Sequence, residues 1–287
     1  MDKSSHPKNE IERLRRRLDE VDHRILALLN RRMEIAKQIG ERKRREAQLI
    51  FDPIREEAVI ADLIQRNPGS LSEQGIRAIF QEIFSSSRAQ QGLLRIGCCC
   101  GAAGLLVAQQ RFGTSDGYRR IRSAKEGGRL LQSGTIDVLI LPKKKLLDLS
   151  SFERRTDNAR LLSVCGEIDP PRTLADHPMV RSGFYMVQRE AEPPQPQEDS
   201  KGRKAVFLVG GCSQGAIDQW RDRFGTPWKE TDARLETEGA PGKGLFVRLW
   251  EAFDPPPLEI LWKGCREICG DSAWIVRLGA YPLSVVE

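Results

Sequence analysis

A stripe of apolar residues, spaced three and four apart, runs along residues 11 to 39 and predicts one long helix. The stripe consists of Ile11, Leu14, Leu18, Val21, Ile25, Leu28, Ile35 and Ile39. Its rhythm breaks at position 32, where an arginine stands, and Lys43 lies about three turns further along the same face. Because an unpaired cation on an inward face is costly, these two cations predict a binding site for an anion.

The predicted helix covers residues 8 to 45 and would be about 55 Å long at 1.5 Å per residue. Two shorter helices follow, one capped by Asp52 with Pro53 in its first turn, the other capped by Ser72. These two helices are too short to cover an apolar stripe of this length. We therefore expect a second copy of the chain to cover the rest of it.

The bulk composition is that of an ordinary soluble protein. The 287 residues are 39% hydrophobic and 30% charged, with a net charge of +6, and this length predicts two or three domains. The first ten residues lack the apolar core of a signal peptide, and no apolar run is long enough to cross a bilayer. We expect a cytoplasmic protein with no membrane partner, whose seven cysteines are reduced.

The pattern changes after residue 92. Residues 93–190 contain a predicted strand at 94–97, a helix at 102–112 and a strand at 135–141, which indicate an α/β region. Residues 191–203 are rich in proline and charge and predict a linker. Residues 204–287 have the order βαββαβ, with strands at 204–210, 233–236, 245–250 and 273–278 and helices at 215–224 and 258–269, which predicts a ferredoxin-like arrangement.

Polar side chains interrupt the apolar faces of the N-terminal helices. They are Arg32 and Lys43 on the first helix, Arg55 and Glu56 at the start of the second, and Ser87 and Gln91 on the third. Arg15 borders the seam about 25 Å from Arg32, so it can reach only the pocket of a partner chain in an antiparallel pair. Any one of these residues could be a solvated surface charge. Because several of them interrupt apolar stripes, the set favours a binding site for a small polyanion. The set contains no histidine or cysteine that could act as a nucleophile.

Several stretches between residues 11 and 91 carry a resemblance to a known family. They are Leu14-Arg15, Val21-Asp22, Leu28 to Arg32, Ile39 to Lys43, Asp52 to Glu56 and Phe84 to Gln91. They resemble the all-helical chorismate mutase domain that opens the bifunctional chorismate mutase–prephenate dehydratases, and this domain would cover residues 1–92. The resemblance implies an intertwined dimeric helical bundle with three helices per chain. It also implies an isomerase of the shikimate pathway that converts chorismate to prephenate, with no cofactor and no metal.

The resemblance assigns the central roles to four residues. Arg15 of the partner subunit and Arg32 would hold the two carboxylates of chorismate. Lys43 would bind a carboxylate and the ether oxygen, and Gln91 would bind the same ether oxygen. Clamping the carboxylates selects the reactive conformer, and donors at the ether oxygen stabilise charge in the transition state. Because a neutral amide needs no proton, Gln91 predicts a flat rate profile around neutral pH.

The remaining pocket residues have supporting roles in the resemblance. Glu56 and the backbone at Asp52 would hold the ring hydroxyl, Ser87 would support a carboxylate, and Arg55 would help to shape the pocket. We count Lys43, Gln91, Arg32 and Glu56 as the predicted catalytic residues, and Asp52, Arg55, Ser87 and the partner's Arg15 as further substrate-binding residues.

The rest of the chain resembles the other parts of the same family in altered form. Residues 93–190 resemble a shortened prephenate dehydratase, with 97–101 in place of its Gly-Pro-x-Gly turn and Lys143-Lys144-Lys145 in place of its Glu-Asn-Ser, so we expect no dehydratase activity. Residues 204–287 resemble an ACT regulatory domain. Gly215, Ala216 and Ile217 match its effector loop, so an aromatic amino acid is a candidate effector, and a purely structural role is the alternative.

Other functions stay open at this point. The pocket would also suit an isochorismate pyruvate-lyase. A non-catalytic amino-acid sensor or scaffold is a third hypothesis, although a scaffold gains nothing from Arg32 in its seam. The basic runs at 13–17 and 42–45 lack interleaved aromatic residues, so we expect no nucleic-acid partner.

Overall fold

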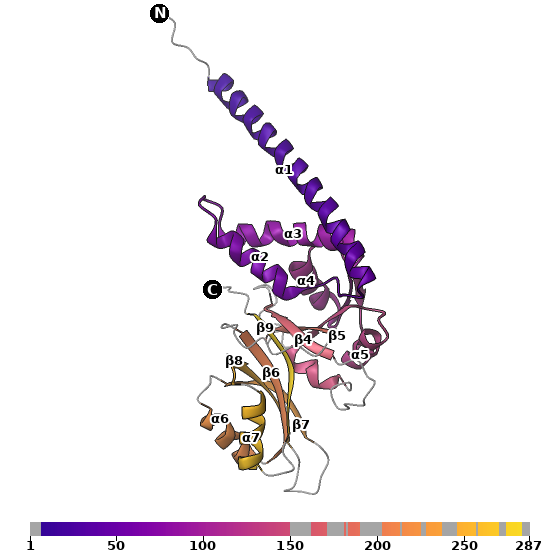
Figure 1. Ribbon diagram of the computed structural model, residues 1–287, viewed down its shortest axis with the longest axis vertical. Helices are drawn as coiled ribbons and strands as arrows, with labels where there is room; N and C mark the ends of the chain where they lie inside the picture. The colour runs from indigo at the N-terminus through magenta and orange to yellow at the C-terminus, as the bar shows by residue number, and fades with distance from the viewer. Residues whose placement is uncertain are drawn as a thin grey trace, which may run out of the picture.

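The computed structural model describes residues 7–149, 162–170, 181, 183–189, 203–212, 214–224, 228–236, 246–256, 258–269 and 274–282. The predicted linker at 191–203 lies outside these residues, except for Arg203. Three parts follow one another along the long axis of the molecule: a helical region, an α/β region, and an antiparallel sheet with two helices (Figure 1). No described helix combines the length and the apolar character that a membrane crossing requires.

The helical region consists of α1 (Pro7–Arg45), α2 (Pro53–Gln65) and α3 (Glu73–Gln91). Both predicted N-caps are confirmed. The Asp52 side chain accepts a hydrogen bond from the Arg55 backbone N–H at 3.0 Å, and Ser72 Oγ accepts from the Gly75 N–H at 3.0 Å. Each cap satisfies a backbone donor that the first helical turn leaves free.

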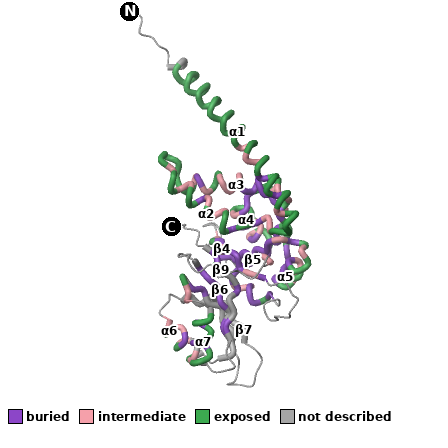
Figure 2. The backbone as a smooth tube through the Cα atoms, in the orientation of Figure 1, coloured by how far each residue is buried: buried purple, intermediate pink, exposed green. Residues whose placement is uncertain are grey.

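The N-terminal half of α1 extends beyond α2 and α3 and leaves its apolar stripe exposed (Figure 2). Leu18 is 61% exposed and Leu28 is 66% exposed. Ala36 and Gly40, further along, are buried. In a single chain, therefore, only the C-terminal part of α1 packs against the rest of the helical region.

The α/β region contains a mixed five-stranded sheet in the order β2-β1-β3-β5-β4. Its elements are β1 (Arg95–Cys98), α4 (Gly101–Phe112), β2 (Gly117–Arg120), α5 (Ala124–Gln132), β3 (Val138–Pro142), the 3-10 helix η1 (Lys143–Asp148), β4 (Leu162–Ile168) and β5 (Phe184–Arg189). Strand β1 pairs in parallel with β2 and β3, whereas β5 pairs antiparallel with β3 and β4. The central strand β3 is buried at every position.

The C-terminal sheet has the order β7-β8-β6-β9, and all its pairings are antiparallel. Its elements are β6 (Arg203–Cys212), α6 (Gln214–Arg223), β7 (Trp228–Glu236), β8 (Phe246–Phe253), α7 (Leu258–Cys269) and β9 (Trp274–Pro282). The predicted order βαββαβ is confirmed, and the strand order is that of a ferredoxin-like fold. Trp220, Leu261 and Cys265 join the helices to one face of the sheet.

The other face of this sheet shares a hydrophobic core with the α/β region. Val206, Leu278 and Tyr281 belong to the same buried cluster as Leu147 and Tyr185. The burial of these apolar side chains stabilises the contact between the α/β region and the C-terminal sheet. The two parts are thus joined by packing as well as by the chain.

Four charged side chains lie at this junction and neutralise one another. Lys143 contacts both Glu167 and Glu251, with the latter at 2.7 Å, and Lys204 contacts the same two carboxylates at 2.8 Å each. Tyr185 donates its hydroxyl to Glu251. Lys143 is the first of the three lysines in the altered dehydratase motif, and the fold uses it to hold the C-terminal sheet.

The junction should weaken in acid because of Glu251. Burial alone would raise the pKa of Glu251, but attraction to Lys143 and bonds from Lys143, Lys204 and Tyr185 lower it from 4.5 to about 2. Its contribution, about 3 kcal/mol, is therefore complete above pH 4.5 and is lost as the pH falls toward 2. We expect Glu251→Gln to lower the melting temperature at pH 7 and to reduce the loss of stability between pH 4.5 and 2.

Thermal unfolding followed by circular dichroism at several pH values checks this expectation. Glu259→Gln is the matched control, since Glu259 is exposed on α7. A Glu251→Gln variant with the melting temperature and acid sensitivity of the native chain would contradict it.

Candidate functional site

Arg32 and Ser87 meet where α1 packs against α3. Arg32 Nη1 donates to Ser87 Oγ, and Ser87 Oγ donates to the Ile83 carbonyl at 2.6 Å. The Arg32 guanidinium also lies 5.4 Å from the centre of the Phe84 ring. Burial lowers the pKa of Arg32, and the Glu56 carboxylate acts against that shift. The predicted cation is therefore half-buried, held in place, and close enough to Glu56 to sense its charge.

Gln91, the last residue of α3, lies against Gly40 of α1. A Cβ atom added at Gly40 would lie 2.5 Å from the Gln91 Cα, so only glycine permits this contact. The Gln91 Oε1 atom is buried and has no hydrogen-bond partner among the described residues. Leaving a buried acceptor unpaired costs about 1–3 kcal/mol of folding free energy. A bound ligand that pairs with the Gln91 amide is therefore the favoured explanation of this unpaired atom.

Lys43 lies almost one turn beyond Gly40 and is half-buried. Its Nζ atom donates to the Ile50 carbonyl at 3.1 Å. Asp52 uses its side chain to cap α2, and its carbonyl accepts from the Glu56 N–H at 3.1 Å. Arg55 is exposed on α2. The structure therefore brings Lys43 to the neighbourhood of Gln91 and leaves Arg55 at the surface.

Glu56 is held by two arginines that sequence analysis did not single out. Arg88 donates to Glu56 Oε1, and Arg111 lies 3.4 Å from Glu56 Oε2. Burial alone would lower the pKa of Arg88, but attraction to Glu56 and Asp116 raises it, so this buried arginine is charged. One signal was available for Arg88: it lies four residues after Phe84 and so continues the buried face of α3. Arg111 gave no such signal, because its partners come from a distant part of the chain.

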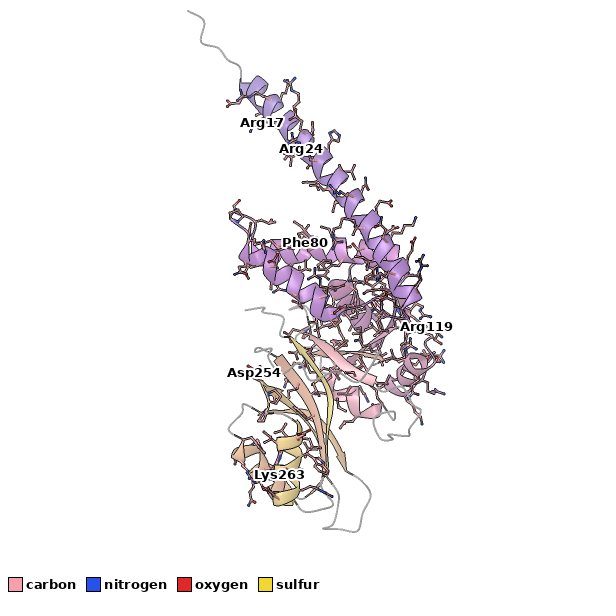
Figure 3. All side chains as sticks on the ribbon, viewed as in Figure 1. Arg17, Arg24, Phe80, Arg119, Asp254 and Lys263 are labelled. Atoms are coloured by element: carbon pink, nitrogen blue, oxygen red, sulfur yellow. The ribbon has the colours of Figure 1, made fainter. Side chains whose placement is uncertain are left out.

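Arg15 does not join these residues within one chain. It lies on the exposed N-terminal half of α1, where Figure 3 labels Arg17 and Arg24 well away from the side chains of α3. This agrees with the 25 Å separation that the helical rise predicts for Arg15 and Arg32.

The candidate effector residues lie in a helix and not in a loop. Helix α6 begins at Gln214, so Gly215, Ala216 and Ile217 belong to its first turns. Gly215 is exposed and Ala216 is half-buried, while the Ile217 side chain lies outside the described part of the structure. The helix predicted at 215–224 is thus confirmed, and the effector role that the resemblance assigns to these residues stays a prediction.

Two of the three glycine-flanked cysteines at 98–100 are buried, unreactive thiols. Cys98 and Cys99 are buried, and burial raises the pKa of both thiols to about 12. Both are therefore neutral thiols near pH 7, and a thiol is a much weaker nucleophile than a thiolate.

Comparison with known proteins supports the assignment of the helical region. Residues 14–92 match the family model for chorismate mutase type II. A bifunctional chorismate mutase/prephenate dehydratase of Stutzerimonas stutzeri is 25% identical over 174 residues, which span 56% of this chain and 46% of that protein. The protein of the same description from Aquifex aeolicus is 30% identical over 91 residues, covering 30% of this chain and 25% of that protein.

The chain thus matches less than half the length of these relatives. Among solved structures, the prephenate dehydratase from Streptococcus mutans matches with a TM-score of 0.43 and 14% identity, covering 66% of this chain and 97% of that one. The family model and the polar residues at the α1–α3 contact lie in the same segment. Residues 14–92 form a domain of the chorismate mutase type II family.

Proposed function

We propose that the chain is a chorismate mutase whose active site lies at the α1–α3 contact. The observation that carries this proposal is the packing of α3 on α1, which pairs Ser87 with Arg32 and sets Gln91 against Gly40, three residues before Lys43. Arg32 and Lys43 supply two cations on α1, and Gln91 supplies a buried amide with an unpaired oxygen on α3, which supports a ligand that carries carboxylates and an ether oxygen. The family match to residues 14–92 supports the same reaction.

In this proposal Arg32 binds one carboxylate of chorismate. Its guanidinium is already oriented by Ser87 and the Phe84 ring, so little conformational freedom is lost on binding. Ser87 supports the carboxylate indirectly, through Arg32. A fixed clamp of this kind selects the compact conformer in which the reacting carbons approach.

Lys43 and Gln91 act on the ether oxygen in this proposal. A half-turn of the Gln91 amide places its NH₂ group where the unpaired Oε1 now lies. Charge develops on this oxygen as the C–O bond breaks, so donors aimed at it stabilise the transition state more than the substrate. At comparable sites one such donor contributes about 3–4 kcal/mol. Glu56 and the backbone at Asp52 remain the proposed ligands of the ring hydroxyl, with Arg55 at the pocket edge.

The second carboxylate requires a partner subunit. The exposed apolar stripe of α1 supports an intertwined dimer, because Leu18 and Leu28 would otherwise remain in water. In an antiparallel pair, Arg15 of the partner subunit reaches the pocket that contains Arg32. Two shared sites per dimer follow from the symmetry of such a pair.

We propose structural or regulatory roles for the rest of the chain. The boundaries we assign are 1–92 for the mutase domain, 93–190 for the α/β region, 191–203 for a linker and 204–287 for an ACT-like domain. Lys143, from the altered dehydratase motif, is occupied by Glu167 and Glu251, which supports the expectation of no dehydratase activity. An aromatic amino acid at the ACT-like domain is the proposed effector.

The decisive experiment is to incubate the purified chain with chorismate at pH 7 and to identify the product. We expect prephenate to accumulate without phenylpyruvate. No turnover would refute the proposed function, and phenylpyruvate would refute the claim that the α/β region is inactive. Isochorismate in a parallel reaction should yield no pyruvate.

The carboxylate clamp predicts that Arg32→Ala loses most of the mutase activity, with kcat/KM falling by about 10²-fold or more, while the helical content is kept. Arg31→Ala is the matched control, because Arg31 is exposed at the neighbouring position. Equal turnover by Arg32→Ala and Arg31→Ala would remove Arg32 from the site.

The ether-oxygen donor predicts a similar loss for Gln91→Leu, about 10²–10³-fold in kcat, because the amide is replaced by a group of similar size that cannot donate. The native rate should vary little between pH 6 and 8, as a neutral amide does not titrate. Initial rates over this range, followed by chorismate absorbance, test both points. A steep rise of the native rate in acid would contradict the role of Gln91.

The shared site predicts that two inactive variants restore one another. Arg15→Ala and Arg32→Ala homodimers each lack a residue in both sites, whereas a hybrid dimer has one complete site. After mixing and reassociation, we expect about a quarter of the native activity, since half of the dimers are hybrids with one intact site each. Light scattering verifies the dimer. Activity that stays at the level of the separate variants would refute a site formed by two subunits.

A further inference from the structure

The α/β region contacts the helical region beside the proposed active site. Helix α4 ends at Phe112, and the loop that follows lies against α3. Gly113 has a φ of 81°, and a Cβ atom there would lie 2.7 Å from the Ser85 Cβ. The Ser115 N–H donates to Ser85 Oγ at 3.0 Å, and Thr114 Oγ1 donates to Glu82 at 3.2 Å. This loop is therefore fitted closely to α3, within one turn of Ser87.

Arg88 extends from α3 into this interface with its side chain only 3% exposed. Its Nη2 atom donates to Asp116 Oδ2 at 2.9 Å and to the Phe112 carbonyl at 2.6 Å. Its Nη1 atom donates to Glu56 Oε1. A guanidinium with acceptors on two sides has a fixed plane, so Asp116 determines where Arg88 holds Glu56.

Arg111, on α4, approaches the same carboxylate from the α/β region. Its Nη1 atom lies 3.4 Å from Glu56 Oε2. The Phe51 and Phe112 rings are 5.0 Å apart, and the guanidinium groups of Arg88 and Arg111 lie 5.5–6.0 Å from them. Phe51 directly precedes Asp52, so this aromatic pair also fixes the start of α2. Both oxygens of Glu56 are thus held by cations outside the substrate clamp.

We propose that Arg111 and Asp116, which lie outside the chorismate mutase domain, are positioning residues for its active site. They hold the Glu56 carboxylate, Arg111 directly and Asp116 through Arg88, and so keep it from pairing with Arg32. Arg32 then remains available for a substrate carboxylate, and Glu56 for the ring hydroxyl. This inference rests on the proposed mutase function, and it makes the α/β region a working part of the mutase site.

The charges at the site explain why such restraint is needed. Arg32 is half-buried, and its neighbour Glu56 is the carboxylate whose charge acts on it. We expect that a Glu56 released by Arg88 and Arg111 would be drawn to Arg32 and would compete with the substrate. Arg88 and Arg111 hold Glu56 through both of its oxygens, and Arg88 is itself anchored by the buried Asp116.

The test is a double-mutant cycle on Arg111 and Glu56. We expect Arg111→Gln to raise the KM for chorismate about tenfold with a smaller change in kcat. The substitution removes one of the two charge-assisted contacts of Glu56, so that the Glu56 carboxylate can more readily pair with Arg32. In a Glu56→Gln background, where no competing carboxylate remains, the same substitution should change KM less than twofold. Arg111→Lys should restore most of the native KM, and Asp116→Asn should raise KM in the same direction as Arg111→Gln.

Thr114→Ala is the matched control, since it removes a contact of the same loop to α3 without touching Arg88, Arg111 or Glu56. We expect native kinetics from it, and native circular dichroism from every variant. Additive effects of Arg111→Gln and Glu56→Gln, or equal effects of Thr114→Ala and Arg111→Gln, would overturn this inference while leaving the mutase function intact. A native chain with no turnover of chorismate would overturn the proposed function and the inference with it.

Discussion

The close contact between α1 and α3 at Gly40 is the constraint on which the helical region depends. No side chain larger than hydrogen fits between Gly40 and the Gln91 backbone. The contact brings Arg32 to Ser87 and places Lys43 beside the end of α3. Only the C-terminal part of α1 takes part in this contact, because its N-terminal half extends beyond α2 and α3 (Figure 1). The chemistry proposed for the domain therefore begins with a packing relation between two helices.

The elements with strong local signals were predicted correctly from the sequence. The limits of α1, the Asp52 and Ser72 caps and the βαββαβ order follow from periodicity and capping, which neighbouring residues determine. Strands β2, β4 and β5 and helix α5 were missed. Strand β2 has four residues and is only partly buried, and β4 and β5 pair with each other across a long stretch of chain. Pairings of that kind leave little trace in local sequence.

The residues of the candidate site likewise separate into those with a local sequence signal and those that meet only in the folded chain. Arg32, Lys43, Ser87 and Gln91 could be found because each breaks an apolar stripe on its own helix. The restraint on Glu56 could not be found, because Arg111 and Asp116 belong to the α/β region and meet Glu56 only in the folded chain. Sequence periodicity describes one element at a time, whereas a charge network is a property of several elements together.

The buried pair of Phe51 and Phe112, with the two arginines beside it, has a consequence for protein engineering. Cutting the chain after residue 92 would strip the helical segment of the surface that covers Phe51 and would leave the Arg88 charge without Asp116. Such a fragment would present an uncovered aromatic ring beside an arginine that keeps Glu56 but has lost its buried partner Asp116. The helical segment of this chain is consequently a poor candidate for transplantation into other proteins, even though the family match is confined to it.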